Sequence, residues 1–95
     1  MMFVIQGFDR PDGAADRAKY GEAHVAHLRS LGERFVIGGP FLDQNGVSIG
    51  SIVVIESERL DTARAAFNRD PYVTEGLFDS VMIKPFKLNI NKTRV

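Results

Sequence analysis

VSIGSIVVIE, residues 47–56, is the stretch of this sequence that decides the fold. It is rich in β-branched residues, which predicts a strand. Successive side chains in a strand point to opposite faces of the sheet. The alternation places apolar residues on both faces, with Val47, Ile49, Val53 and Ile55 on one and Ile52 and Val54 on the other. A strand that is apolar on both faces is expected to be covered on both sides.

Three further strands are predicted around this stretch. Arg34–Phe41 is a strand joined to residues 47–56 through Asp43-Gln-Asn-Gly46, whose Asn-Gly pair supplies the positive φ angles of a tight hairpin. These two strands are therefore expected to be antiparallel neighbours. Met2–Phe8, β-branched and aromatic, predicts the first strand, and Gly76–Phe86 predicts the last.

Two helices are predicted between the strands. The first runs from about Asp16 to Leu31, although Gly21 disfavours helix by about 1 kcal/mol and makes a start nearer Gly21 the alternative. One face of it carries Tyr20, His24, His27, Leu28 and Leu31. The second has Ser57 as its expected N-cap. Leu60, Ala63, Arg64 and Phe67 lie along one stripe of it. Asp70-Pro71 then opens a short helical turn that ends at Gly76.

The order strand, helix, strand, strand, helix, strand predicts an α+β domain of the ferredoxin-like βαββαβ type, a single domain over residues 1–95. Both helices lie on one face of a four-stranded antiparallel sheet in that fold. Because the other face is apolar and nothing else in the sequence covers it, we expect a homodimer that packs sheet against sheet. Residues 89–95 are either a loose tail or an arm that contacts the partner.

Composition restricts the partners and the compartment. Lys plus Arg and Asp plus Glu are balanced at 12 each, so no excess positive charge favours a nucleic-acid partner. The sequence has no cysteine, which fits a cytoplasmic protein and excludes disulfides and thiolate metal sites. No apolar stretch approaches the roughly 20 residues of a membrane helix, so we expect no membrane partner.

His24 and Asp70 are the candidate catalytic pair. His24 shares its helical face with Leu28 and Leu31, which places the imidazole against the sheet, where a neutral ring acts as a general base. The alternative for His24 is a core histidine satisfied by a carbonyl group. His27 is the possible polar end of the same stripe and is expected to be mostly structural. Asp70 is either only the N-cap before Pro71 or also a partner that fixes the tautomer of His24.

Four further residues are candidates for binding a small-molecule substrate. Gly39 and Pro40 end a strand where a backbone can approach a ligand closely, unless they only bend the strand edge. Ser51 either fills a tight position or donates a hydrogen bond into a pocket, and Tyr72 either packs or binds a ligand. Two histidines three residues apart lack a third ligand, so no metal site is expected. No glycine-rich phosphate loop follows a strand, so we expect no cofactor.

Several of these residues together resemble a known family. The motifs, in order along the chain, are Ala23-His24-Val-Ala-His-Leu28, Gly38-Gly39-Pro40, Gly50-Ser51, Asp70-Pro71-Tyr72, Gly76 and Val81-Met-Ile-Lys84-Pro85-Phe86. The set resembles the YciI-like (YCII-related) proteins over nearly the whole chain. The resemblance implies a ferredoxin-like fold that pairs into a dimeric α+β barrel. It also implies an active site with a His-Asp dyad and a nearby serine, at His24, Asp70 and Ser51.

The resemblance extends to function. Related members include a dehydrochlorinase of a chlorinated hydroxyhydroquinone, and muconolactone isomerase is a more distant relative by fold. The family often has Arg-Pro where this chain has Gly21-Glu22, so a cationic substrate anchor is missing here. We expect a cofactor-free enzyme that uses proton transfer for elimination or isomerisation of a small cyclic or aromatic metabolite. The alternative is a non-catalytic dimeric module that binds a small metabolite or a partner protein.

Overall fold

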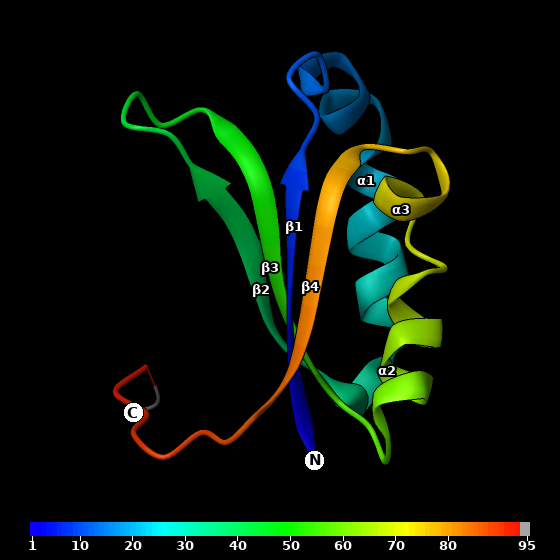
Figure 1. The fold of residues 1–95 in the computed structure, drawn as a ribbon, viewed down its shortest axis with the longest axis vertical. Helices are drawn as coiled ribbons and strands as arrows, with labels where there is room; N and C mark the ends of the chain where they lie inside the picture. Colours follow the sequence, from blue (N-terminus) through cyan, green and yellow to red (C-terminus); the bar gives the residue numbers. More distant parts are fainter. Residues whose placement is uncertain (94–95) are drawn as a thin grey trace.

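The central stretch forms strand β3 of a four-stranded antiparallel sheet in the computed structural model, which describes residues 1–93 (Figure 1). The sheet order is β2-β3-β1-β4. The strands are β1 (Met2–Asp9), β2 (Phe35–Leu42), β3 (Ser48–Glu56) and β4 (Phe78–Phe86). The helices are α1 (Ala14–Ser30), α2 (Leu60–Phe67) and α3 (Pro71–Thr74), with a 3₁₀ turn, η1, over Gly32–Arg34. This arrangement confirms the predicted ferredoxin-like fold.

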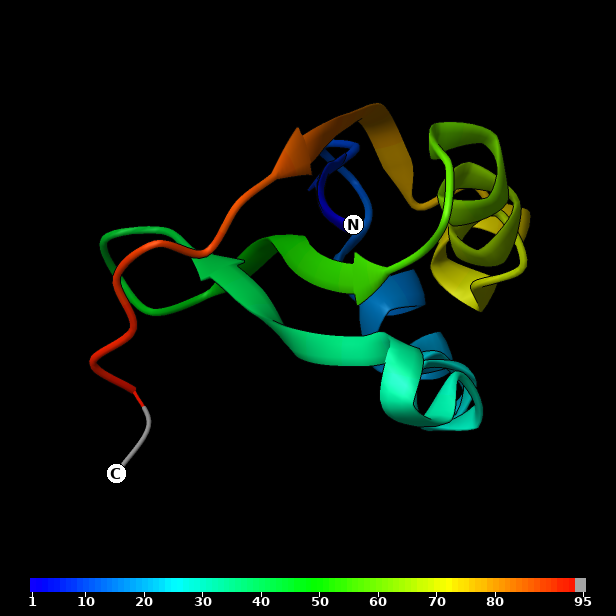
Figure 2. The same ribbon diagram turned by 90° about the horizontal axis from the view of Figure 1, so that it is seen from below.

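The hydrophobic core lies between the helices and one face of the sheet, and Figure 2 shows the helices gathered on that side. The alternation of β3 sends Val53 and Ile55 into this core. The other buried members of the cluster are Phe3, Ile5, Leu28, Leu31, Ala63 and Phe67. The opposite face of the sheet, here called the open face, carries Gly50, Ile52 and Val54 of β3, whereas a register shift before Gly50 puts Ser48 on the helix-covered side.

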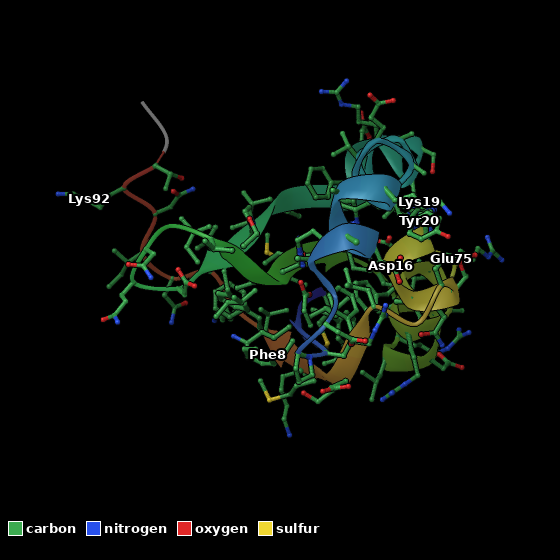
Figure 3. All side chains as sticks on the ribbon, turned by 90° about the horizontal axis from the view of Figure 1, so that it is seen from above. Phe8, Asp16, Lys19, Tyr20, Glu75 and Lys92 are labelled. Carbon is green, nitrogen blue, oxygen red and sulfur yellow. The ribbon has the colours of Figure 1, made fainter. Side chains whose placement is uncertain are left out.

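The open face is apolar and only partly covered within the chain. Val54 on this face is buried, whereas Ile37, its register partner on β2, is 56% exposed. Tail residues 88 and 90–93 line a groove of about 620 Å³ together with this face. Figure 3 shows Lys92 of the tail far from Asp16 of α1 and from Glu75, the residue after α3. The final tail residues, Arg94 and Val95, lie outside the described part of the chain.

Helix α1 begins at Ala14, earlier than either predicted start. The first turn is held by ion pairs that sequence periodicity does not report: Arg17 with Asp9, and Arg10 with Asp16. Gly21 lies inside the helix, and a Cβ at this position would come within 3.3 Å of the Tyr72 hydroxyl. These tertiary contacts offset the low helix propensity of Gly21.

Two expectations about local structure are wrong. Ser57 is not the N-cap of α2, which begins at Leu60 after Arg59. The Ser57 amide instead donates to the Met1 carbonyl at 2.9 Å, so Ser57 still pairs with the sheet. Val47 lies before β3 and is 53% exposed, because the Asp43 carboxylate accepts its amide at 3.0 Å and holds it in the hairpin loop.

None of the helices described in residues 1–93 has the length and apolar character that crossing a membrane requires.

Gly50 allows two aromatic rings to stack across the open face. It pairs with Phe8 on β1 and with Phe41 on β2. The rings of Phe8 and Phe41 lie parallel with centroids 5.4 Å apart. A Cβ at position 50 would lie 2.6 Å from the Gly7 carbonyl oxygen and 3.1 Å from the Phe41 ring. The Gly7 carbonyl group cannot move away from such a Cβ without disturbing the pairing of β1 with β3, so position 50 requires glycine.

We predict that Gly50→Ala lowers the free energy of unfolding by about 1–3 kcal/mol, the usual cost of overpacking. The matched control is Gly39→Ala on β2, where an added Cβ meets nothing within 4 Å. The control should be as stable as the original protein or slightly more stable. Urea unfolding of all three proteins at one protein concentration measures the difference. Equal midpoints for Gly50→Ala and Gly39→Ala would contradict the steric argument.

Candidate active site

His24 is placed by α1 next to Asp70, the residue before α3. The Nδ1 atom of His24 lies 2.6 Å from Oδ2 of Asp70, across 46 positions of sequence. The His24 ring stacks on Tyr72, with centroids 4.1 Å apart and planes 18° from parallel. The side chain of His24 is only 12% exposed, so both contacts hold a ring that solvent reaches at one side.

Asp70 is fully buried and uses its two oxygens for different tasks. It is the N-cap of α3, and its Oδ1 atom accepts the Tyr72 amide at 2.9 Å. Its other oxygen, Oδ2, faces His24. Pro71 at the first helical position fixes the backbone that directs the carboxylate. A buried carboxylate needs such partners, since an unpaired one is costly.

The hydrogen bond to Asp70 determines which nitrogen of His24 is available. An ionised carboxylate only accepts hydrogen bonds, so Nδ1 donates and Nε2 carries the lone pair in the neutral ring. Within residues 1–93, Nε2 has no hydrogen-bond partner, whereas every buried side-chain nitrogen or oxygen has one. Nε2 is therefore accessible to solvent, and it is the atom that can take up a proton.

Arg17, two turns before His24 on the same face of α1, forms a second network. Its Nε and Nη2 atoms donate to the two Asp9 oxygens at 2.6 and 2.8 Å. Nη2 also donates to Oγ of Ser51 at 3.0 Å, and the guanidinium lies 4.7 Å from the centre of the Tyr72 ring. Burial lowers the pKa of Arg17 and the hydrogen-bonded Asp9 carboxylate raises it, with a net upward shift.

Both networks border one cavity of about 600 Å³, here called the His24 cavity. Its lining residues are Arg17, Gly21, His24, Val25, Leu28, Arg29, Phe35, Gly38, Gly39, Pro40, Ser48, Ser51 and Tyr72. Asp70 is behind this lining and reaches the cavity only through His24. The size suits a small ligand, and the mixture of apolar walls with a few polar groups is typical of binding sites.

The sequence-predicted binding residues all line the His24 cavity, but in different ways. Pro40 pairs with Ser51 and so shares the helix-covered face of the sheet with it. Gly39 pairs with Ile52 of the open face, which leaves only its backbone for the cavity. Gly38, in register with Val53, is the glycine whose missing side chain faces the helices.

Sequence reasoning missed Arg17 and Asp9. Arg17 precedes His24 by seven positions, which is two helical turns on the same face, so its spacing was an available signal. The predicted stripe began at Tyr20 and did not include Arg17. The predicted first strand ended at Phe8, one residue before Asp9, and only the folded backbone brings the Asp9 carboxylate to Arg17.

His27 lies one turn after His24 and has a different environment. Its Nε2 atom is 2.9 Å from the carbonyl oxygen of Ala66, a contact between α1 and α2. The contact gives His27 a place in the packing of the two helices, whereas the carbonyl-bonded alternative considered for His24 is not what the structure has at position 24. No group of three His, Cys, Asp or Glu side chains suited to a metal ion occurs within residues 1–93.

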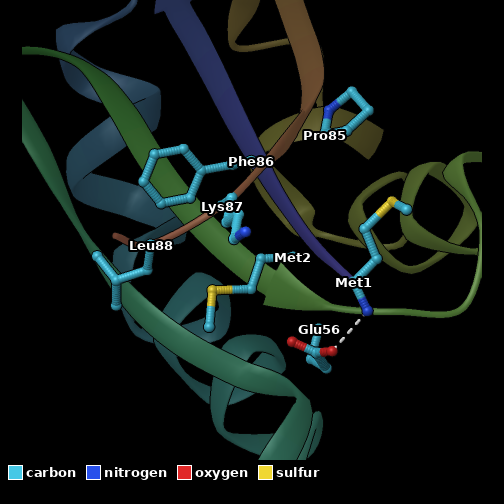
Figure 4. Close-up of a pocket in the computed structure, with 7 residues that line it drawn as sticks. All are labelled: Met1, Met2, Glu56, Pro85, Phe86, Lys87 and Leu88. Carbon is cyan, nitrogen blue, oxygen red and sulfur yellow. Dashed lines mark hydrogen bonds and ion pairs between the residues drawn. The ribbon is translucent and has the colours of Figure 1, made fainter. Parts of the chain in front are cut away.

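A separate cavity of about 640 Å³ lies at the end of the sheet where the chain begins (Figure 4). Its carboxylate, Glu56, is already paired with the Met1 amino group at 2.6 Å. Met2, Phe86 and Leu88 are among its other lining residues. The cavity brings no titratable pair comparable to His24 and Asp70, so we assign the chemistry to the His24 cavity.

We predict that Tyr72→Phe has a lower free energy of unfolding than the original protein, and that this difference is largest at neutral pH. The Tyr72 hydroxyl donates to the Arg17 carbonyl at 3.1 Å, a bond worth about 1 kcal/mol. Burial raises the pKa of Tyr72, so the unfolded chain ionises first as pH rises. The stability gained from the neutral phenol is complete below about pH 10 and is lost above it. Urea unfolding should show a constant difference up to about pH 9 and convergence of the two proteins as pH rises above about 10. A constant gap would contradict this.

Known proteins with similar sequences and structures agree with this fold. The chain is 36% identical to the Escherichia coli protein named YciI, over 92% of this chain and 97% of that protein. An uncharacterised protein of Haemophilus influenzae is 34% identical over the same shares.

Two solved structures extend the comparison. One is 5-chloro-2-hydroxyhydroquinone dehydrochlorinase (TftG) from Burkholderia phenoliruptrix in complex with 2,5-dihydroxybenzoquinone. It has a TM-score of 0.83 and 29% identity, over 92% of this chain and 94% of that one. SnoaB, a cofactor-independent oxygenase from Streptomyces nogalater, shares the fold at a TM-score of 0.57 and 15% identity, over 98% and 96% of the two chains. Residues 1–87 match the model of the YCII-related domain, and the chain therefore belongs to the YCII-related family.

Proposed function

We propose that this protein is a cofactor-independent enzyme in which His24 removes a proton from a small cyclic or aromatic metabolite. The observation that carries the proposal is the 2.6 Å contact between Nδ1 of His24 and the buried Asp70 carboxylate, with Nε2 left accessible. Asp70 keeps the proton on Nδ1 and stabilises the imidazolium that forms when Nε2 accepts a proton. It is a positioning residue, because His24 separates it from the substrate.

The same proton transfer supports two reactions. Removal of the proton leaves an electron pair in the conjugated system of the substrate. If a carbon of that system bears chloride, the pair expels it, and the sum of the two steps is loss of HCl. Without a leaving group, return of the proton to another carbon gives an isomer. Both reactions need a base and an orienting group, which His24 and Asp70 supply.

The walls of the His24 cavity suit a flat ring. Leu28, Phe35 and Tyr72 offer apolar surface, while Ser51 and Arg17 add polar groups at one side. The 29% identity to a dehydrochlorinase whose structure holds a dihydroxybenzoquinone supports elimination on an oxygenated ring. A cytoplasmic location stays a prediction from the cysteine-free sequence.

We predict that His24→Gln lowers kcat for 5-chloro-2-hydroxyhydroquinone by roughly 10² to 10⁴-fold, the usual contribution of a positioned base. Chloride release measured against pH reports the rate. The acidic limb of the profile should disappear in the variant, because protonation of His24 causes it. Binding of 2,5-dihydroxybenzoquinone, followed by calorimetry, should be retained.

The matched control is His27→Gln, one turn along α1, where glutamine still has an amide that can donate to the Ala66 carbonyl. This variant should keep its turnover and its pH profile. Binding without any turnover by the unsubstituted protein would favour the alternative of a non-catalytic binding module. Full turnover by His24→Gln would remove His24 from the mechanism.

We also propose that the open face is the interface of a homodimer. The face exposes large apolar side chains that a second copy would cover: Phe8, Ile37, Met82 and Phe86 are each more than 40% exposed. Their positions on β1, β2 and β4 spread the apolar surface across the whole sheet. When two copies pack these faces against each other in an isologous interface, each face covers the other and neither stays exposed.

We predict a dimer in sedimentation velocity at micromolar concentration, and a monomer for Ile37→Lys. Ile37 is 56% exposed within the chain, so lysine there does not disturb the core of the protomer. Leu60→Lys is the control, because Leu60 is 41% exposed on α2, on the helical side of the molecule. This control should remain dimeric. A monomeric unsubstituted protein, or dissociation by the control variant alone, would exclude the open face as the interface.

A further inference from the structure

The hydroxyl group of Ser51 has its hydrogen-bonding direction set by Arg17. A guanidinium group has only donors, so the 3.0 Å contact between Nη2 and Oγ makes the serine oxygen the acceptor. Arg17 is itself fixed by two bonds to Asp9, and the side chains of both are largely buried, at 12% and 8% exposed. The fork geometry of the guanidinium leaves it one orientation in this pair.

The hydroxyl hydrogen of Ser51 is consequently left for a ligand. It cannot point at Arg17, and the Ser51 hydroxyl makes no other hydrogen bond within residues 1–93. Ser51 lines the His24 cavity on β3, while His24 borders the cavity from α1. A hydroxyl that accepts from a cation becomes a stronger donor, since hydrogen bonds in a chain polarise one another.

We propose that Arg17 and Asp9 preset Ser51 as a donor to a carbonyl or enolate oxygen of the substrate, which makes oxygenated conjugated rings the substrate class. The inference rests on the proposed proton transfer to His24. When the bond to the departing proton breaks, its electron pair moves through the conjugated system onto the ring oxygen. The proton is then on Nε2 of His24, and the Ser51 hydroxyl donates to the new oxyanion.

This arrangement assigns different roles to the three residues. Ser51 contacts the substrate oxygen and stabilises charge that develops in the transition state. Arg17 and Asp9 are positioning residues in this step, because they act on the substrate oxygen through Ser51. Ser48 lines the same cavity on the same strand but accepts no hydrogen bond from Arg17, so Ser48 serves as the control for Ser51.

The first test is the infrared spectrum of bound 2,5-dihydroxybenzoquinone, which does not depend on turnover. A hydrogen bond lowers the stretching frequency of a carbonyl group, so the band should move to higher frequency in Ser51→Ala. It should move in the same direction in the double variant Asp9→Asn/Arg17→Met, which removes both charges of the buried pair together and keeps the serine. Ser48→Ala should leave the band in place.

The second test is steady-state turnover of 5-chloro-2-hydroxyhydroquinone. Ser51→Ala should lower kcat by about 10² to 10³-fold, the usual loss of one oxyanion donor. The double variant should lower kcat by at least about tenfold with little change in KM, because the hydroxyl is present but free to rotate. A purely structural role for Arg17 would lower the melting temperature and leave the infrared band unchanged.

The outcomes separate this inference from the proposed function. If Ser51→Ala changes neither the infrared band of the bound quinone nor kcat, the donor role of Ser51 is overturned and the base role of His24 stays intact. Retained turnover in His24→Gln, with the band still shifted in Ser51→Ala, overturns the base role and leaves the donor role. Failure of the unsubstituted protein to bind the quinone overturns the assigned substrate class. A band shift in Ser48→Ala in place of Ser51→Ala transfers the donor role to Ser48 and overturns the inference.

Discussion

The buried carboxylate of Asp70 is the constraint on which the arrangement of the helices depends. A charge with no exposed surface is tolerated only when its oxygens are hydrogen-bonded, and here the partners come from two different helices. The Tyr72 amide at the start of α3 occupies one oxygen, and His24 on α1 occupies the other. Removing either partner would leave an unsatisfied charge in the core. The packing of α3 on α1 and the orientation of the imidazole are thus set by the same group.

Tyr72 connects the two networks of the site. The His24 ring stacks on the Tyr72 ring, and the guanidinium of Arg17 also lies over the Tyr72 ring. The Tyr72 hydroxyl bonds the backbone of Arg17, and its amide bonds Asp70. A single aromatic side chain therefore fixes the spacing between the base and the Arg17–Asp9 pair. Gly21 leaves room for the tyrosine hydroxyl, since a Cβ at position 21 would lie 3.3 Å from it.

The sequence predicts the order of strands and helices well, because alternation in β3 and the helical spacing of His24, Leu28 and Leu31 are local signals. The N-cap geometry of Asp70 is also local and follows from the proline after it. The starts of α1 and α2 were misplaced because ion pairs and strand pairing, which local propensity does not include, decide them. The Arg17–Ser51 bond joins residues 34 positions apart, so it depends on how the helix sits against the sheet and no pattern in the sequence reports it.

The polar groups of the site come from β1, α1, β3 and the start of α3, and the tail residues 87–93 contribute none to the His24 cavity. The open face and the tail form a separate region of the molecule. Natural variation can therefore act on the two regions independently. Substitutions in the tail or on the open face leave the lining of the His24 cavity unchanged, and substitutions at the rim of that cavity leave the apolar surface of the open face unchanged.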